Sequence, residues 1–227
     1  GGAGADTVTT TTAMTAASTM GAGNDTVTYG GAASTATGLV GSMAAGTGTD
    51  TIIMTDAQAA AADGTSAFNT AWTGFETLQL SDAMAEDGLN LDGLNNVSTV
   101  ILAAGATTAT ISNLDSGGTV QFTDTNSTGT TTIAVDGAAF SASDILNLTI
   151  SNSGDVYVAA TVVAANVETV NITANDKITA DADITTLGSA AAINTMTLTA
   201  TAAKTITVSG NNGLTLGSAG GTAVTTF

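Results

Sequence analysis

The sequence predicts an all-β fold, a parallel β-solenoid or β-roll with short strands and little helix. Three glycine-rich turns near the start are each followed by one aspartate and a short β-forming segment. Beyond them, short stretches alternate Thr or Asn with aliphatic residues, a period-two pattern typical of strands that bury one face. Thr is the commonest residue and Pro is absent, which favours uninterrupted strands. The recurring turns favour a solenoid over a β-sandwich.

The turns are copies of one nonapeptide. Residues 1–9 read GGAGADTVT and match the pattern G-G-x-G-x-D-x-U-x, in which U is a large aliphatic residue. Drifted copies begin at Gly21 (GAGNDTV) and at Gly46 (GTGTDTI). This pattern resembles the calcium-binding repeat of RTX proteins, in which U points into the core of a β-roll.

The residue types fit calcium chemistry. Ca²⁺ takes six to eight oxygen ligands from carboxylates, carbonyls and water, and glycines with positive φ let several carbonyls converge. The alternative is that these turns are plain glycine turns that bind nothing. The predicted metal-binding residues are Gly2, Gly4, Asp6, Gly21, Gly23, Asn24, Asp25, Gly46, Gly48 and Asp50.

The spacing of the aspartates predicts how the turns stack. Asp25 follows Asp6 by 19 residues, close to two nonapeptides, which make one full coil of a roll. The two carboxylates should therefore lie on the same side and could share an ion. Asp50 follows Asp25 by 25 residues, so we expect a looped insertion in that coil, between Gly30 and Ala45.

The chain divides into three parts. Residues 1–56 are expected to form the RTX-like coils, residues 57–72 an Ala-rich insertion or short helix, and residues 73–227 a continuing solenoid. Phe68 and Trp72 are one helical turn apart, and Trp72, the single tryptophan, is expected to be a packing anchor. We interpret the whole as a piece of a longer chain.

The alternating pattern predicts short strands along the whole chain. They are Thr7–Thr9, Thr26–Tyr29, Thr51–Met54, Glu76–Leu80, Ser98–Leu102, Thr108–Ile111, Thr119–Thr123, Thr132–Val135, Leu146–Ile150, Asp155–Val158, Thr169–Thr173, Met196–Thr199, Thr205–Val208 and Leu214–Leu216.

Residues 74–80 and 166–172 share an internal repeat, in which Glu-Thr precedes two alternating aliphatics. Glu76 and Glu168 therefore either bind a cation or accept hydrogen bonds from backbone amides of the next coil. Further acids between residues 82 and 92 and between 176 and 183 do not fit an EF-hand loop. They either hold calcium outside the motif or line solvated loops.

Composition excludes several function classes. The formal charge is −17, from 19 acidic residues against only Lys177 and Lys204. So acidic a chain is not expected to bind nucleic acid or insert into anionic membranes, whereas it suits cations. It has no Cys and no His, which excludes catalytic thiols, His-based triads and the usual zinc sites. No catalytic residue is predicted, and we expect no enzyme activity.

Five segments carry a further resemblance. Residues 1–8, 20–28, 74–80, 167–173 and 210–227 resemble, in the same order, segments in the C-terminal part of the surface-layer (S-layer) proteins of Caulobacter-type bacteria. The resemblance implies a calcium-laden β-solenoid that joins copies of itself in a two-dimensional lattice on the cell surface. It also implies export by type I secretion and attachment to lipopolysaccharide through a domain outside this sequence.

The predicted function is therefore structural: an extracellular surface-layer segment whose folding and assembly require calcium. One alternative is a calcium-stabilised binding module of a secreted RTX adhesin, although aromatics at 4% leave little for a stacking platform. Another is an accessory module of a secreted polysaccharide-acting enzyme, whose catalytic domain would lie elsewhere.

Overall fold

The computed structural model describes residues 1–11, 14, 16–32, 41–85, 88–95, 97–123, 125–152, 158–176 and 193–217.

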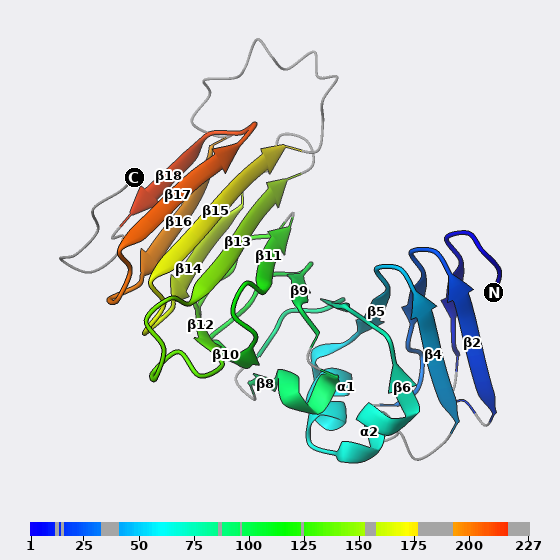
Figure 1. The fold of residues 1–227 in the computed structure, drawn as a ribbon. Helices are drawn as coiled ribbons and strands as arrows, with labels where there is room; N and C mark the ends of the chain where they lie inside the picture. Colours follow the sequence, from blue (N-terminus) through cyan, green and yellow to red (C-terminus); the bar gives the residue numbers. More distant parts are fainter. Residues whose placement is uncertain are drawn as a thin grey trace, which may run out of the picture.

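One face of the molecule is a parallel sheet of nine strands. Its strands are neighbours in the order in which the chain makes them, so each strand belongs to the next coil of a solenoid (Figure 1). They are β1 (Thr7–Thr9), β3 (Thr26–Thr28), β5 (Thr51–Met54), β7 (Thr77–Leu80), β9 (Thr99–Leu102), β11 (Thr119–Thr123), β13 (Ile145–Asn152), β15 (Thr169–Asp176) and β17 (Thr205–Gly210).

The even-numbered strands form the opposite face, again with parallel pairing. This face is divided into a three-stranded and a six-stranded sheet. The strands are β2 (Ala17–Ala22), β4 (Ser42–Thr47) and β6 (Trp72–Thr73), then β8 (Leu89–Asn90), β10 (Ala109–Leu114), β12 (Thr130–Val135), β14 (Ala159–Val163), β16 (Asn194–Thr199) and β18 (Leu214–Gly217). The prediction of an all-β, parallel solenoid-like fold is confirmed.

The register places equivalent residues of successive coils side by side. Thr26 pairs with Thr51, Thr51 with Thr77 and Thr77 with Thr99, so the aliphatic residues that follow them also align. Those aliphatic residues form a buried column between the two faces. It comprises Val27, Ile52, Leu78, Val100 and Val120. Because side chains alternate along a strand, a shift of one residue would expose this column, and burial therefore fixes the register.

Three short helices lie where the second face divides: α1 (Asp56–Asp63), α2 (Ser66–Ala71) and the 3₁₀ helix η2 (Leu91–Leu94). The Ala-rich segment, expected as an insertion or short helix, thus forms two α-helices. A capping box between Thr55 and Gln58 fixes the start of α1, since each side chain bonds the backbone N–H of the other.

Trp72 is the centre of an aromatic cluster beside these helices and is only 1% exposed. Its ring centroid lies 5.3 Å from that of Tyr29, 5.8 Å from that of Phe68 and 6.4 Å from that of Phe75. Trp72 is therefore a packing anchor, as its sequence context predicts. The spacing of Phe68 and Trp72 identified one of its three partners.

Several segments differ from the sequence prediction, and β2 and β8 were not predicted at all. The looped insertion expected between Gly30 and Ala45 is partly wrong, because β4 begins at Ser42; residues 33–40 lie outside the described residues. β4 lacks β-branched residues in its centre but buries Met43 and Ala45 between β2 and β6. The strand expected at 155–158 falls mostly on residues that are not described, and β14 begins only after Val158.

No helix among the described residues is long and apolar enough to cross a membrane.

Two phenylalanines provide a matched test of the core. Phe122 is fully buried in β11, whereas Phe140 is 97% exposed. Phe122→Ala should destabilise the fold by about 3–5 kcal/mol, and Phe140→Ala by no more than about 0.5 kcal/mol. Urea denaturation of both variants in one buffer measures the difference, and similar losses would contradict the proposed core.

Candidate metal-binding turns

One position in each coil, immediately before the odd-numbered strand, carries an acidic residue in the first four coils. We call Asp6, Asp25, Asp50 and Glu76 the pre-strand column. They precede β1, β3, β5 and β7, whose first residues are paired in register. The aspartates of the three turns therefore stack on one side of the solenoid, as their spacing predicts, and Glu76 continues the column.

Hydrogen bonds connect the column from coil to coil. The backbone N–H of Asp6 donates to Oδ1 of Asp25 (2.8 Å), and that of Asp25 donates to Oδ1 of Asp50 (2.7 Å). The backbone N–H of Asp50 donates in turn to Oε2 of Glu76 (2.8 Å). Each bond to a carboxylate satisfies a backbone donor that the strand ladder does not reach.

The second oxygens of two of these carboxylates are the strongest indication of a ligand. Asp25 is 1% exposed and Asp50 is fully buried. Within the described part of the chain, Oδ2 of each has no hydrogen-bond partner. A buried carboxylate oxygen without a partner is costly, so such atoms call for a bound ion, water or proton.

The glycines let backbone carbonyls of successive turns stack closely. Gly21, Gly23, Gly46 and Gly48 have φ of 118°, 127°, 117° and 144°, a region that side chains rarely adopt. A Cβ on Gly46 would overlap the carbonyl oxygen of Gly21. The turns thus stack carbonyl against glycine, an arrangement possible only without side chains.

The first turn is more open than the other two. Gly2 and Gly4 are exposed, and a Cβ on either would meet no atom within 4 Å. The backbone N–H of Gly2 donates to Oδ2 of Asp6 (2.9 Å), which occupies that oxygen. Asn24 is also exposed, and its Oδ1 accepts a bond from the backbone N–H of Thr49 (3.0 Å). The second and third turns therefore present the better-formed candidate ligands.

Charge repulsion is the main electrostatic feature of the column. Adjacent strands are about 4.8 Å apart, and at an effective dielectric constant of about 20 two carboxylates at that distance repel by roughly 3 kcal/mol. The only basic side chains of the whole sequence are Lys177 and Lys204. A cation bound among the turns would offset this repulsion.

The donor atoms suit a hard cation with oxygen ligands such as Ca²⁺. No group of three or more acidic side chains converges on one point among the described residues. Most ligands of such an ion would therefore be backbone carbonyls of the glycine turns. Asp25 and Asp50 would supply the charge.

The glycine turns end at the fourth coil. In this coil the residue before the acidic position is Phe75, which is buried and packs against Trp72. The corresponding residues of the two preceding turns are Thr49 and Asn24. Glu76 bonds a backbone amide, one of the two roles its sequence context allows, although the amide belongs to the preceding coil and not the next. Glu168 does the same with the backbone N–H of Asp144 (3.0 Å).

Among the described residues, the acids of the other acidic segments do not gather into one site. Oδ1 of Asp82 accepts a bond from the backbone N–H of Asp56 (2.6 Å), and Oδ2 of Asp92 accepts from Nδ2 of Asn113 (2.9 Å). The remaining predicted acids lie outside the described residues, except Asp176, the last residue of β15. These residues are Glu86, Asp87, Asp181 and Asp183.

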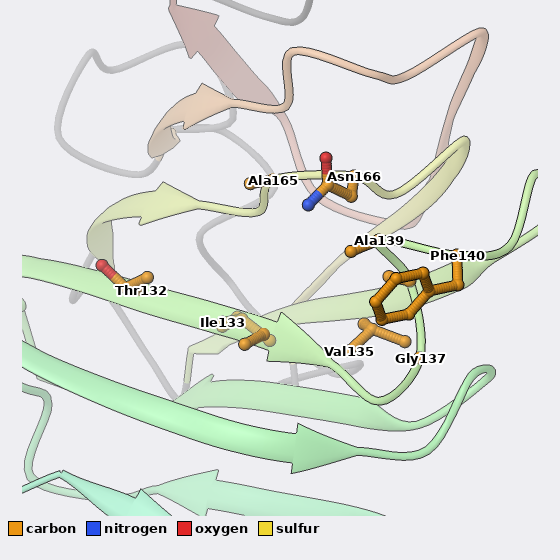
Figure 2. Close-up of a pocket in the computed structure, with 10 residues that line it drawn as sticks. Thr132, Ile133, Val135, Gly137, Ala139, Phe140, Ala165 and Asn166 are labelled. Atoms are coloured by element: carbon orange, nitrogen blue, oxygen red, sulfur yellow. The ribbon is translucent and has the colours of Figure 1, made fainter.

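A surface pocket lies far from the column, beside the exposed Phe140 (Figure 2). Ile133, Val135 and Ala139 supply apolar lining, and Thr132 and Asn166 supply the polar groups. Its lining contains no carboxylate, so this pocket offers no acid–base pair. No motif or pattern in the sequence indicated this pocket.

No protein-family model matches the chain, and no curated protein matches it significantly in sequence. Support for metal binding therefore comes from the geometry of the turns.

Glycine replacement tests the stacking of the turns. Gly46→Ala places a Cβ against the Gly21 carbonyl at a strained φ and should cost more than about 3 kcal/mol. Gly137→Ala is the control, because Gly137 has a φ of 65° and open space around it. It should cost only about 1–2 kcal/mol. Equal losses in urea denaturation would contradict the close packing of the turns.

Asp63, at the end of α1, gives a pH-dependent prediction. Burial raises the pKa of its carboxyl above the usual 3.8, opposed by a hydrogen bond from the backbone N–H of Asn90 (2.7 Å). The ionised carboxylate therefore destabilises the fold above that raised pKa, and this penalty is absent below pH 3.8. Asp63→Asn keeps an oxygen acceptor. It should stabilise the protein by roughly 0.5 kcal/mol at pH 7.

The advantage of Asp63→Asn should disappear as the pH falls below 3.8. Thermal unfolding of both proteins across this pH range measures it. A gain that persists at low pH would show that charge burial is not its cause.

Proposed function

We propose that this chain is a structural segment of a bacterial surface layer, and that calcium bound in its glycine turns drives its folding and its assembly with copies of itself. The observation that carries the calcium proposal is a pair of buried oxygens, Oδ2 of Asp25 and Oδ2 of Asp50, which have no hydrogen-bond partner in the part of the chain that the structure describes. They lie beside glycine turns whose carbonyls can supply the remaining ligands.

Calcium would act on the folding equilibrium. An ion that binds only the folded state stabilises it by RT ln(1 + [Ca²⁺]/Kd), which is about 2.7 kcal/mol at a hundredfold excess over Kd. Without the ion, Asp25 and Asp50 repel each other and keep unsatisfied oxygens. A few such sites contribute as much as the entire stability of many domains.

Two further observations support the surface-layer role. Five segments of the sequence resemble surface-layer proteins in the same order. The formal charge of −17 would oppose the approach of one copy to another, and divalent cations between copies would reduce that repulsion. We therefore propose an extracellular location at the cell surface, where calcium can act both within and between subunits.

The binding module of a secreted adhesin is the second candidate. The pocket beside Phe140 favours it, because an exposed aromatic next to an apolar hollow is a common recognition element. This reading shares the calcium-dependent fold and differs in assembly, since an adhesin module would fold to a monomer.

Calcium titration into EDTA-stripped protein tests both parts. Circular dichroism should show a gain of β-structure that EDTA reverses, and light scattering should show growth into large assemblies. Folding to a stable monomer would favour the adhesin module. An equal response to magnesium, or no response, would refute the calcium proposal.

Asp50→Asn separates charge from hydrogen bonding. The amide oxygen still accepts the bond from Asp25, so the variant should fold but require at least about tenfold more calcium. In EDTA it should be as stable as the parent or more stable, because one repelling charge is gone.

Asp136→Asn is the control for that substitution, since it makes the same change of charge on an exposed loop. It should leave the calcium midpoint unchanged. Identical midpoints for Asp50→Asn and Asp136→Asn would exclude Asp50 as a ligand.

A further inference from the structure

Asp144 and Glu168 repeat the geometry of the pre-strand column in the second half of the chain. They immediately precede β13 and β15, whose first residues, Ile145 and Thr169, are paired. The backbone N–H of Asp144 donates to Oε2 of Glu168 (3.0 Å), just as that of Asp50 donates to Oε2 of Glu76. The same Asp–Glu step therefore occurs twice.

The second step also contains a buried oxygen without a partner. Asp144 is 5% exposed, and Oδ2 has no hydrogen-bond partner among the described residues. Glu168 is buried as well, so two carboxylates of adjacent coils lie close together away from solvent. Two ionised carboxylates on adjacent coils repel each other, as in the first column.

The surroundings differ from those of the glycine turns in a way that predicts weaker binding. The segment between Gly137 and Asp144 contains no further glycine, so converging carbonyls are fewer. Ser116 contributes a hydroxyl nearby, whose Oγ accepts a bond from the backbone N–H of Ile145 (3.0 Å). Lys204 follows Glu168 in register and donates its backbone N–H to the Glu168 carbonyl (2.8 Å).

We propose that Asp144 and Glu168 hold one Ca²⁺ ion in a second site, separate from the glycine turns. The inference extends the calcium chemistry proposed above, but it depends on different carboxylates. In the nine-stranded sheet, β13 lies three strands beyond β7, with β9 and β11 between them. The two sites therefore do not share ligands.

Equilibrium dialysis of the full chain against Ca²⁺ tests the proposal by counting bound ions. Asp144→Asn, which keeps its backbone N–H and an amide oxygen, should bind one ion fewer than the parent. Asp136→Asn, the same change of charge eight residues earlier, should bind as many ions as the parent. An unchanged count in Asp144→Asn overturns the site. If that variant fails to fold by circular dichroism, Glu168→Gln serves in its place with the same expected loss.

Terbium luminescence distinguishes this site from the glycine turns. Trp72 sensitises Tb³⁺ bound nearby, and Gly74, two residues later, contacts Gly46 in the third turn. Asp144→Asn should leave this signal unchanged, whereas Asp50→Asn should reduce it. A lower ion count in Asp50→Asn but not in Asp144→Asn would overturn the second site alone. The reverse result would overturn the glycine turns and support the second site.

Discussion

The hydrogen bond between a side-chain oxygen before one strand and a backbone N–H before the preceding strand organises this solenoid. The carboxylate of Asp25 accepts such a bond from the backbone N–H of Asp6, and that of Asp50 accepts one from Asp25. The carboxylate of Glu168 likewise accepts one from the backbone N–H of Asp144. Amide side chains make the same contact elsewhere, since Oδ1 of Asn194 accepts from the backbone N–H of Val158 (2.8 Å). Each such bond satisfies a backbone donor at the point where a turn becomes a strand. It thereby helps to fix the register of the strands and of their buried aliphatic column.

Using a carboxylate for this bond has an electrostatic consequence that an amide does not have. Asn194 is neutral, so it makes this bond without adding charge to its coil. Asp25 and Asp50 add charge at each step, and their second oxygens have no partner among the described residues. The acidic columns thus combine a structural hydrogen bond with a local excess of negative charge, which is the feature from which cation binding is proposed.

Much of this fold could be predicted from sequence because the signals are local. Alternation of Thr with aliphatics identified strands such as Thr119–Thr123, and the 19-residue spacing predicted that Asp6 and Asp25 stack. Strand β4 was missed because Met43, Ala44 and Ala45 have little intrinsic preference for strands, and only their position between β2 and β6 makes them one.

The second acidic step was harder to recognise. Glu168 was identified from the internal repeat, but its partner Asp144 has no glycine motif before it. In addition, the first residues of β11 and β13 are not paired: Thr119 pairs with Asn147, not with Ile145. The residue before β11 therefore does not align with Asp144. Only the three-dimensional pairing brings Asp144 into a column with Glu168.

The direction of these bonds makes the solenoid asymmetric along its axis. In the bonds to the pre-strand carboxylates, the acceptor belongs to the later coil and the backbone donor to the earlier one. For these side-chain bonds, removing a later coil would leave a backbone N–H without its acceptor, whereas removing an earlier coil would leave a carboxylate oxygen that water or a cation can serve. Each coil therefore supplies carboxylate acceptors to the coil made before it. A segment that closes the last coil should supply acceptors of the same kind.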